Sequence, residues 1–236
     1  MPLALLAMFC FSLFANCLFA GDADRPPNFV VIFADDLGYG DISCYSANAA
    51  TTPHLDAMAE QGFRSTDFFV PANVCSPSRA ALLTGRYPMR CGIPVAHGGP
   101  LRLKCKDYGL VPEEITIPEL LKPAGYRSLM VGKWHLGMEV EGSHPIDAGF
   151  DEYLGIPSNY NKGAGPDYNT LFRVKDVEQK NVPCQQLTQR YTDEVVQFIE
   201  RQKDSPFFIY VSLTRIRRWL PVCKNTPKQS GLSWVT

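Results

Sequence analysis

The sequence lacks a surplus of charge of either sign. Its 236 residues carry 23 Lys and Arg against 24 Asp and Glu, a net charge of −1. Bulk charge therefore gives no basis for binding nucleic acid, and no nucleic-acid partner is expected. Disorder and fibrous structure are also excluded, because 45% of the residues are hydrophobic and the composition is varied. The chain is long enough to bury a core, and it has no internal repeat.

The sequence also lacks an N-glycosylation sequon and, after residue 20, a segment that could span a membrane. No Asn-x-Ser/Thr sequon with a permitted middle residue occurs, so ordinary N-glycosylation is not expected. No segment after residue 20 is apolar for long enough to span a bilayer. Residues 1–20, in contrast, carry no charged side chain and end at the small Ala20, which is typical of a secretory signal peptide. A membrane anchor is the alternative, because about twenty apolar residues just suffice to cross a bilayer.

Export through the secretory pathway would expose the cysteines to oxidising conditions. Two of the eight, Cys10 and Cys17, would leave with the signal peptide. The others are enough for three disulfides, whose pairing the sequence does not fix. They are Cys44, Cys75, Cys91, Cys105, Cys184 and Cys223.

Apolar runs alternate with amphipathic segments along the chain. This alternation predicts an α/β layered fold with a mostly parallel central sheet. In such sheets, functional sites form at the carboxyl ends of the strands. The expected strands are 28–34, 63–70, 126–131 and 206–213, and the expected helices are 53–62, 78–84, 115–124 and 186–202. Residues 140–184 are rich in Gly, Pro, Asn and Asp, and are expected to be a long irregular excursion.

Three polar clusters follow these elements, and each has two interpretations. Asp35 and Asp36 come directly after an apolar strand; a hard divalent cation would relieve their mutual repulsion, and the alternative is an Asp-rich turn. Cys75 precedes a helix whose dipole favours its thiolate, or else it is a disulfide cysteine. Lys133 and His135 share one turn, which suits an anionic tetrahedral group; the alternative is a surface lysine beside a packed histidine.

Together these clusters closely resemble the motifs of the sulfatase family, most of all its arylsulfatase A branch. The resemblance covers about residues 28–213 and implies the alkaline-phosphatase-like fold. The motifs that carry it are Cys75-Ser76-Pro77-Ser78-Arg79, Asp35-Asp36-Leu37-Gly38-Tyr39-Gly40-Asp41, Val131-Gly132-Lys133-Trp134-His135-Leu136-Gly137 and Gly149-Phe150-Asp151-Glu152-Tyr153.

The resemblance implies a catalytic residue made after synthesis. A formylglycine-generating enzyme would oxidise Cys75, with Pro77 and Arg79 as its recognition core, and covalent catalysis on a sulfate ester would follow. Asp35, Asp36 and the modified Cys75 would hold Ca²⁺, or Mg²⁺.

The remaining roles concern the sulfate group. Arg79 would stabilise the charged nucleophile, and Lys133 and His135 would bind sulfate oxygens. Ser158 is expected to supply a further hydroxyl near the sulfate. The protein would act in the secretory pathway, either secreted or in the lysosome.

The chain also departs from the family pattern. It is about half the usual length, and Arg215 and Arg217 stand where histidines are expected. We therefore expect a signal peptide at 1–20, the N-terminal part of a catalytic domain at 21–213, and a divergent, disordered tail at 214–236. A truncated, inactive product or a binder of sulfated ligands is the alternative function. A related metal-dependent phosphatase is a third, which the cysteine motif disfavours because ordinary phosphatases use Ser or Thr.

Overall fold

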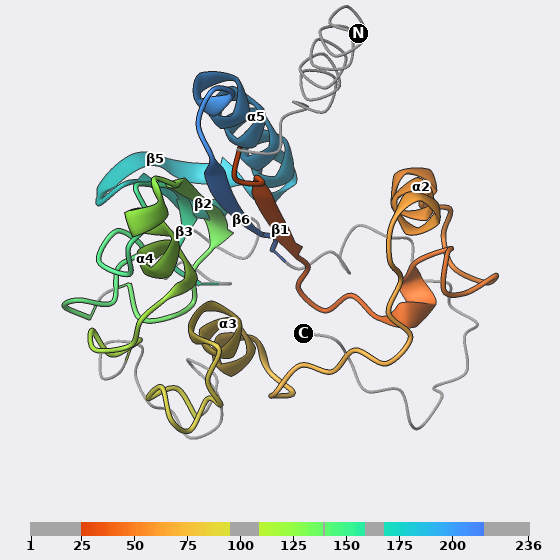
Figure 1. Ribbon diagram of the computed structural model, residues 1–236, viewed down its shortest axis with the longest axis horizontal. Helices are drawn as coiled ribbons and strands as arrows, with labels where there is room; N and C mark the ends of the chain where they lie inside the picture. Colours follow the sequence, from red (N-terminus) through yellow and green to blue (C-terminus); the bar gives the residue numbers. More distant parts are fainter. Residues whose placement is uncertain (1–24, 95–108, 139, 159–167, 215–236) are drawn as a thin grey trace, which may run out of the picture.

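The computed structural model describes residues 25–94, 109–138, 140–158 and 168–214. They form one six-stranded sheet with helices on both faces (Figure 1). The strands are β1 (Phe29–Phe33), β2 (Arg127–Lys133), β3 (Glu152–Ile156), β4 (Tyr168–Arg173), β5 (Asp176–Pro183) and β6 (Phe207–Ser212). The helices are α2 (Pro53–Gln61), α3 (Cys75–Thr84), α4 (Ile117–Leu121) and α5 (Cys184–Gln202), with the short 3-10 helices η1 (Tyr39–Asp41) and η2 (Lys122–Ala124).

The sheet is mixed and mostly parallel. Its strand order is β1-β6-β2-β3-β4-β5, and β1, β6, β2 and β3 run parallel. The pairings of β4 with β3 and with β5 are antiparallel. The predicted α/β fold is therefore confirmed. Because the four parallel strands share a direction, the segments that follow them all begin at one edge of the sheet.

Alternating side chains of the central strands supply two separate cores. Phe208 and Tyr210 of β6 pack on one face, in a cluster that includes Ala80 and Leu83 of α3. Phe207, Ile209 and Val211 pack on the other face against α5, whose apolar positions fall on one side of the helix. These two layers hold the centre of the sheet rigidly, and the polar edge described below is built on that centre.

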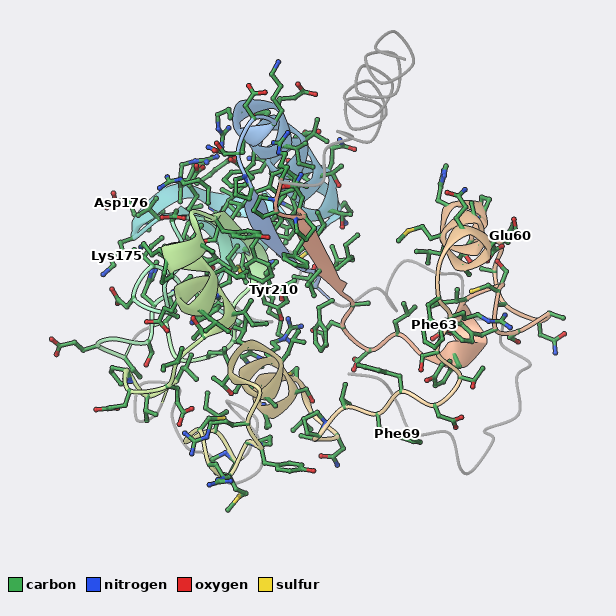
Figure 2. The ribbon with its side chains drawn as sticks, in the orientation of Figure 1. Glu60, Phe63, Phe69, Lys175, Asp176 and Tyr210 are labelled. Carbon is green, nitrogen blue, oxygen red and sulfur yellow. The ribbon has the colours of Figure 1, made fainter. Side chains whose placement is uncertain are left out.

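Residues 63–70 do not form the predicted strand. Their aromatic side chains suggest a strand, but Phe63, Phe68 and Phe69 are 93%, 52% and 72% exposed. Figure 2 shows Phe63 and Phe69 on the segment that carries α2, apart from the sheet, whereas Tyr210 is packed within the main body. Aromatic residues favour a strand only where a neighbouring strand pairs with them and packs against their side chains. Residues 63–70 pair with no strand of the described sheet.

The prediction for residues 140–184 is also wrong. Glycine and proline made this region look irregular, but β3, β4 and β5 all lie within it. Two smaller differences concern helices: α3 begins at Cys75 rather than at residue 78, and α4 changes at Leu121 into the 3-10 turn that contains Pro123. Proline lacks the N–H that would continue an α-helix, which explains the second difference.

Several predictions concern cysteines and membrane segments. Cys44, Cys75, Cys91 and Cys184 form no disulfide with one another, and Cys105 and Cys223 lie outside the described residues. No helix within the described ranges is both long and apolar enough to span a bilayer. The expected signal peptide and the tail from residue 215 onward also lie outside these ranges.

A buried carboxylate on α5 predicts how stability depends on pH. Burial raises the pKa of Glu194, but hydrogen bonds from Arg173 (2.8 Å) and Arg201 (3.4 Å) outweigh it, and the pKa is lowered overall. A lowered folded-state pKa stabilises the fold above the unfolded pKa, and this stabilisation is lost as the pH falls through the folded value. We expect Glu194→Gln to flatten the fall in unfolding free energy between about pH 5 and pH 3. Urea titrations at several pH values measure this, and the exposed Glu200→Gln is the control. An unchanged slope in Glu194→Gln would contradict the assignment.

Candidate active site

A buried carboxylate stands at the centre of the polar edge. Asp35 lies two residues beyond the end of β1 and is 3% exposed. Lys133, the last residue of β2, donates a hydrogen bond from Nζ to Asp35 Oδ2 over 2.5 Å. Arg79 Nη2 lies 3.6 Å from the same oxygen. The structure thus brings together three predicted site residues from β1, β2 and α3, with both cationic side chains fully buried.

Helix α3 carries the cysteine to this edge. The helix begins at Cys75, follows the extended residue Val74 and ends at Gly85, which has the left-handed φ of 66° that glycine adopts readily. Cys75 Sγ lies 3.1 Å from His135 Nδ1. A side chain at the first position of a helix also lies in the positive field of the helix dipole. Cys75 and His135 therefore form a nucleophile–imidazole pair beside the buried ion cluster.

The turn after β2 is fixed by the neighbouring strand. The backbone N–H of Trp134 donates to Ile156 O over 3.0 Å, and that of His135 donates to Pro157 O over 2.8 Å. The indole N–H of Trp134 donates to Ser143 O over 2.7 Å. His135 itself has a left-handed φ of 61°, which is unusual for a residue other than glycine. These contacts turn the chain sharply after β2 and bring His135 within reach of Cys75.

Arg79 is held by contacts that the sequence did not reveal. Its Nη1 donates to Ser212 Oγ and lies 3.4 Å from the hydroxyl oxygen of Tyr210. The guanidinium also lies over the Phe33 ring, 5.2 Å from its centroid. Arg79 Nε and Nη2 are buried and have no hydrogen-bond partner among the described residues. The arginine therefore keeps donors that an anion at this edge would satisfy.

The site is crowded with cationic groups. Burial lowers the pKa of Lys133 below its ordinary value, and Arg79 lowers it further, whereas Asp35 opposes both effects. Two buried basic side chains thus share one close carboxylate. A second negative charge would relieve this imbalance, which makes the edge suited to an anionic ligand.

Two other predicted residues lie nearby in the fold. Asp36 follows Asp35 in the turn after β1 and has a left-handed φ of 59°. Ser158 lies two residues beyond β3, whose carboxyl end is at the same edge as that of β2. Ser212 and Tyr210 were not predicted as site residues. The sequence feature that could have identified Ser212 is its position as a polar residue near the carboxyl end of the apolar run 206–213.

The metal site implied by the family motifs is only partly present. Asp35 offers the carboxylate oxygens that hard cations bind, and Asp36 adjoins it. Across residues 25–94, 109–138, 140–158 and 168–214, however, no three His, Cys, Asp or Glu side chains cluster closely enough to hold a metal ion. Because Ca²⁺ takes about 6–8 oxygen ligands, the described residues fit part of such a site without completing it.

The fold and this constellation define a class: an α/β protein with a cysteine, a histidine and buried cationic groups at the carboxyl edge of a parallel sheet. The family model described as Sulfatase matches residues 27–230, and the chain belongs to the sulfatase family. The relatives that match the chain include sulfatases, which are enzymes of sulfuric ester hydrolysis.

Known relatives agree with this assignment. Arylsulfatase A of Homo sapiens is 51% identical over 140 residues, which cover 59% of this chain and 27% of that protein. Arylsulfatase G of Homo sapiens is 35% identical over 258 aligned residues, covering 95% of this chain and 48% of that protein. The crystal structure of the PsFucS1 sulfatase from Pseudoalteromonas sp. matches with a TM-score of 0.66 and 29% identity, over 81% of this chain and 44% of that one. The chain thus spans half or less of the length of these relatives.

Proposed function

We propose that the chain carries the catalytic edge of a sulfuric ester hydrolase of the arylsulfatase type, with the side chain of residue 75 as its reactive group. The observation that carries this proposal is the contact of 3.1 Å between Cys75 and His135 beside a fully buried Arg79 with unpartnered donors. A nucleophile next to a proton-transfer group and anion-binding donors is the arrangement that ester hydrolysis of an anionic group requires.

The chain's own residues divide the work of binding and proton transfer. Arg79 would donate its Nε–H and Nη2–H to sulfate oxygens, since neither group has a hydrogen-bond partner in the described structure. His135 contacts the residue 75 side chain through Nδ1, so it is placed to exchange a proton there. Lys133, held against Asp35, supplies further positive charge to the sulfate. Ser158, beyond β3, would add a hydroxyl near the substrate.

Two groups that the chain does not encode would complete this chemistry. A formylglycine-generating enzyme would convert the Cys75 thiol to an aldehyde, and that enzyme must supply the oxidant. Addition of water to this aldehyde would give residue 75 a geminal diol, one hydroxyl of which would be the nucleophile in place of the thiol. A divalent cation, Ca²⁺ or Mg²⁺, would be held in part by Asp35 and Asp36 and would neutralise negative charge on the sulfate. Modification by that enzyme implies passage through the secretory pathway, with residues 1–20 as the signal peptide.

Hydrolysis of a small aryl sulfate tests the proposal. We expect the purified chain with formylglycine at residue 75 to release sulfate from 4-nitrocatechol sulfate, and to do so more slowly after treatment with a chelator. The phosphate ester 4-nitrophenyl phosphate is the matched control, and it should be hydrolysed far more slowly. Binding of the aryl sulfate without release of sulfate would instead favour a non-catalytic binder of sulfated ligands. Equal hydrolysis of both esters would favour a phosphatase.

A further inference from the structure

We propose that Ser212 is a positioning residue that aims the guanidinium of Arg79 at the bound sulfate group. This inference rests on the proposed function for the identity of the anion, but the orientation of Arg79 stands on the structure alone. Ser212 is the last residue of β6 and is fully buried. Its backbone lies between Phe33 at the end of β1 and Gly132 near the end of β2. It therefore stands at the centre of the catalytic edge.

The hydroxyl of Ser212 has its donor and acceptor roles fixed by its partners. Its single hydrogen is donated to the backbone carbonyl of Lys133, over 2.6 Å. The Ser212 Oγ can therefore take part in further hydrogen bonds only as an acceptor, and it accepts one from Arg79 Nη1. One hydroxyl thus connects the strand that carries Lys133 to the arginine on α3.

This contact decides where the rest of the guanidinium points. The group is planar, so fixing Nη1 on Ser212 and placing the plane over Phe33 leaves little rotational freedom. Nη2 then lies 3.6 Å from Asp35, and Nε and Nη2 keep hydrogens that no described group accepts. Without the Ser212 oxygen, Nη1 would keep only its longer hydrogen bond to the Tyr210 hydroxyl, over 3.4 Å, and the guanidinium would be expected to rotate.

The backbone beside Ser212 is tightly packed. A Cβ built on Gly132, whose φ is +102°, would lie 1.9 Å from the Ser212 backbone oxygen, so the backbone of β6 leaves no room for a side chain at position 132. A small hydroxyl side chain bridges Lys133 and Arg79 within that space. Alanine removes the acceptor, whereas threonine retains it.

Nitrogen NMR of protein labelled with ¹⁵N-arginine tests the orientation directly. We expect the Arg79 guanidinium, assigned by its loss in Arg79→Lys, to show separate, slowly exchanging Nη–H signals in the wild-type chain. Ser212→Ala should merge or broaden them, and Ser212→Thr should retain them. Ser128→Ala is the matched control. Ser128 is 2% exposed, lies near the start of β2 and so away from the carboxyl edge, and its hydroxyl is bonded to Asp151. We expect this variant to leave the Arg79 signals unchanged.

Binding of inorganic sulfate supplies the functional readout. We expect Ser212→Ala to weaken the sulfate Kd about tenfold relative to both the wild type and Ser128→Ala. Unchanged Arg79 signals in Ser212→Ala, or an equal change in Ser128→Ala, would overturn the inference. If Ser212→Ala does not fold, loss of the signals in Ser212→Thr would overturn it and their retention would support it. If the wild type binds no sulfate but only Ser212→Ala alters the Arg79 signals, the positioning role stands and the proposed function fails.

Discussion

Cys75→Ser is expected to reduce sulfate-ester turnover to the background rate. Serine retains the size of the side chain and its contact with His135, so binding and folding should change little. It lacks the thiol that the modifying enzyme oxidises, so residue 75 cannot become an aldehyde. Because this group makes and breaks the covalent bond in the proposed reaction, its loss should remove about 10³-fold or more of the activity. Release of sulfate from 4-nitrocatechol sulfate, measured at saturating substrate, gives the comparison.

A second cysteine provides the control for this variant. Cys44 is half-buried near α2, outside the site, and it lines a surface hollow with Asp56, Glu60 and Arg64. Cys44→Ser should therefore retain wild-type turnover and wild-type unfolding behaviour. Substantial activity in Cys75→Ser would show that residue 75 is not the reactive group.

Gly132→Ala is expected to destabilise the fold strongly. Gly132 has a φ of +102°, and an added Cβ would lie 1.9 Å from Ser212 O and 2.8 Å from Ser212 C. Both atoms belong to the backbone of β6, so neither can move aside without separating β2 from β6. Backbone strain and overpacking together predict a loss of about 2–5 kcal/mol in the free energy of unfolding. Denaturant titration followed by circular dichroism measures this loss.

Gly125 separates the effect of the backbone angle from that of crowding. It has a similar φ of +82°, but nothing lies within 4 Å of an added Cβ. Gly125→Ala should therefore cost only about 1–2 kcal/mol, the energy of a left-handed alanine. Equal losses in the two variants would contradict the claim that the backbone of β6 leaves no room for a side chain at Gly132.

The central strands of the fold were predictable because burial on both faces leaves continuous apolar runs. β6 is buried along its whole length and β2 along all but its first residue, and each appears in the sequence as an apolar segment. The strands missed within 140–184 differ from these. β5, with the sequence DVEQKNVP, is mostly exposed and antiparallel, so it has no apolar run to mark it. Conversely, the aromatic run at 63–70 has the composition of a strand, although it pairs with no strand of the described sheet.

The site residues that could be predicted lie within short, chemically distinctive sequence motifs. Asp35, Cys75, Lys133 and His135 each belong to a motif with several unusual residues in a row. The contacts between them were not predictable, because Asp35 and Lys133 are 98 positions apart. Ser212 was missed for a similar reason: one serine in an apolar strand carries no motif, and its importance comes from the strands that flank it.

The chemical state of residue 75 decides whether the proposed reaction can occur. Trypsin cleavage after Arg64 and Arg79 releases peptide 65–79, which contains Cys75 and no other cysteine. For chain isolated from cells that contain the modifying enzyme, mass spectrometry should show this peptide with sulfur and two hydrogens lost and one oxygen gained, and the peptide should react with a hydrazine probe. A peptide that keeps an intact thiol, alkylated by iodoacetamide, or that forms a disulfide, would contradict the account.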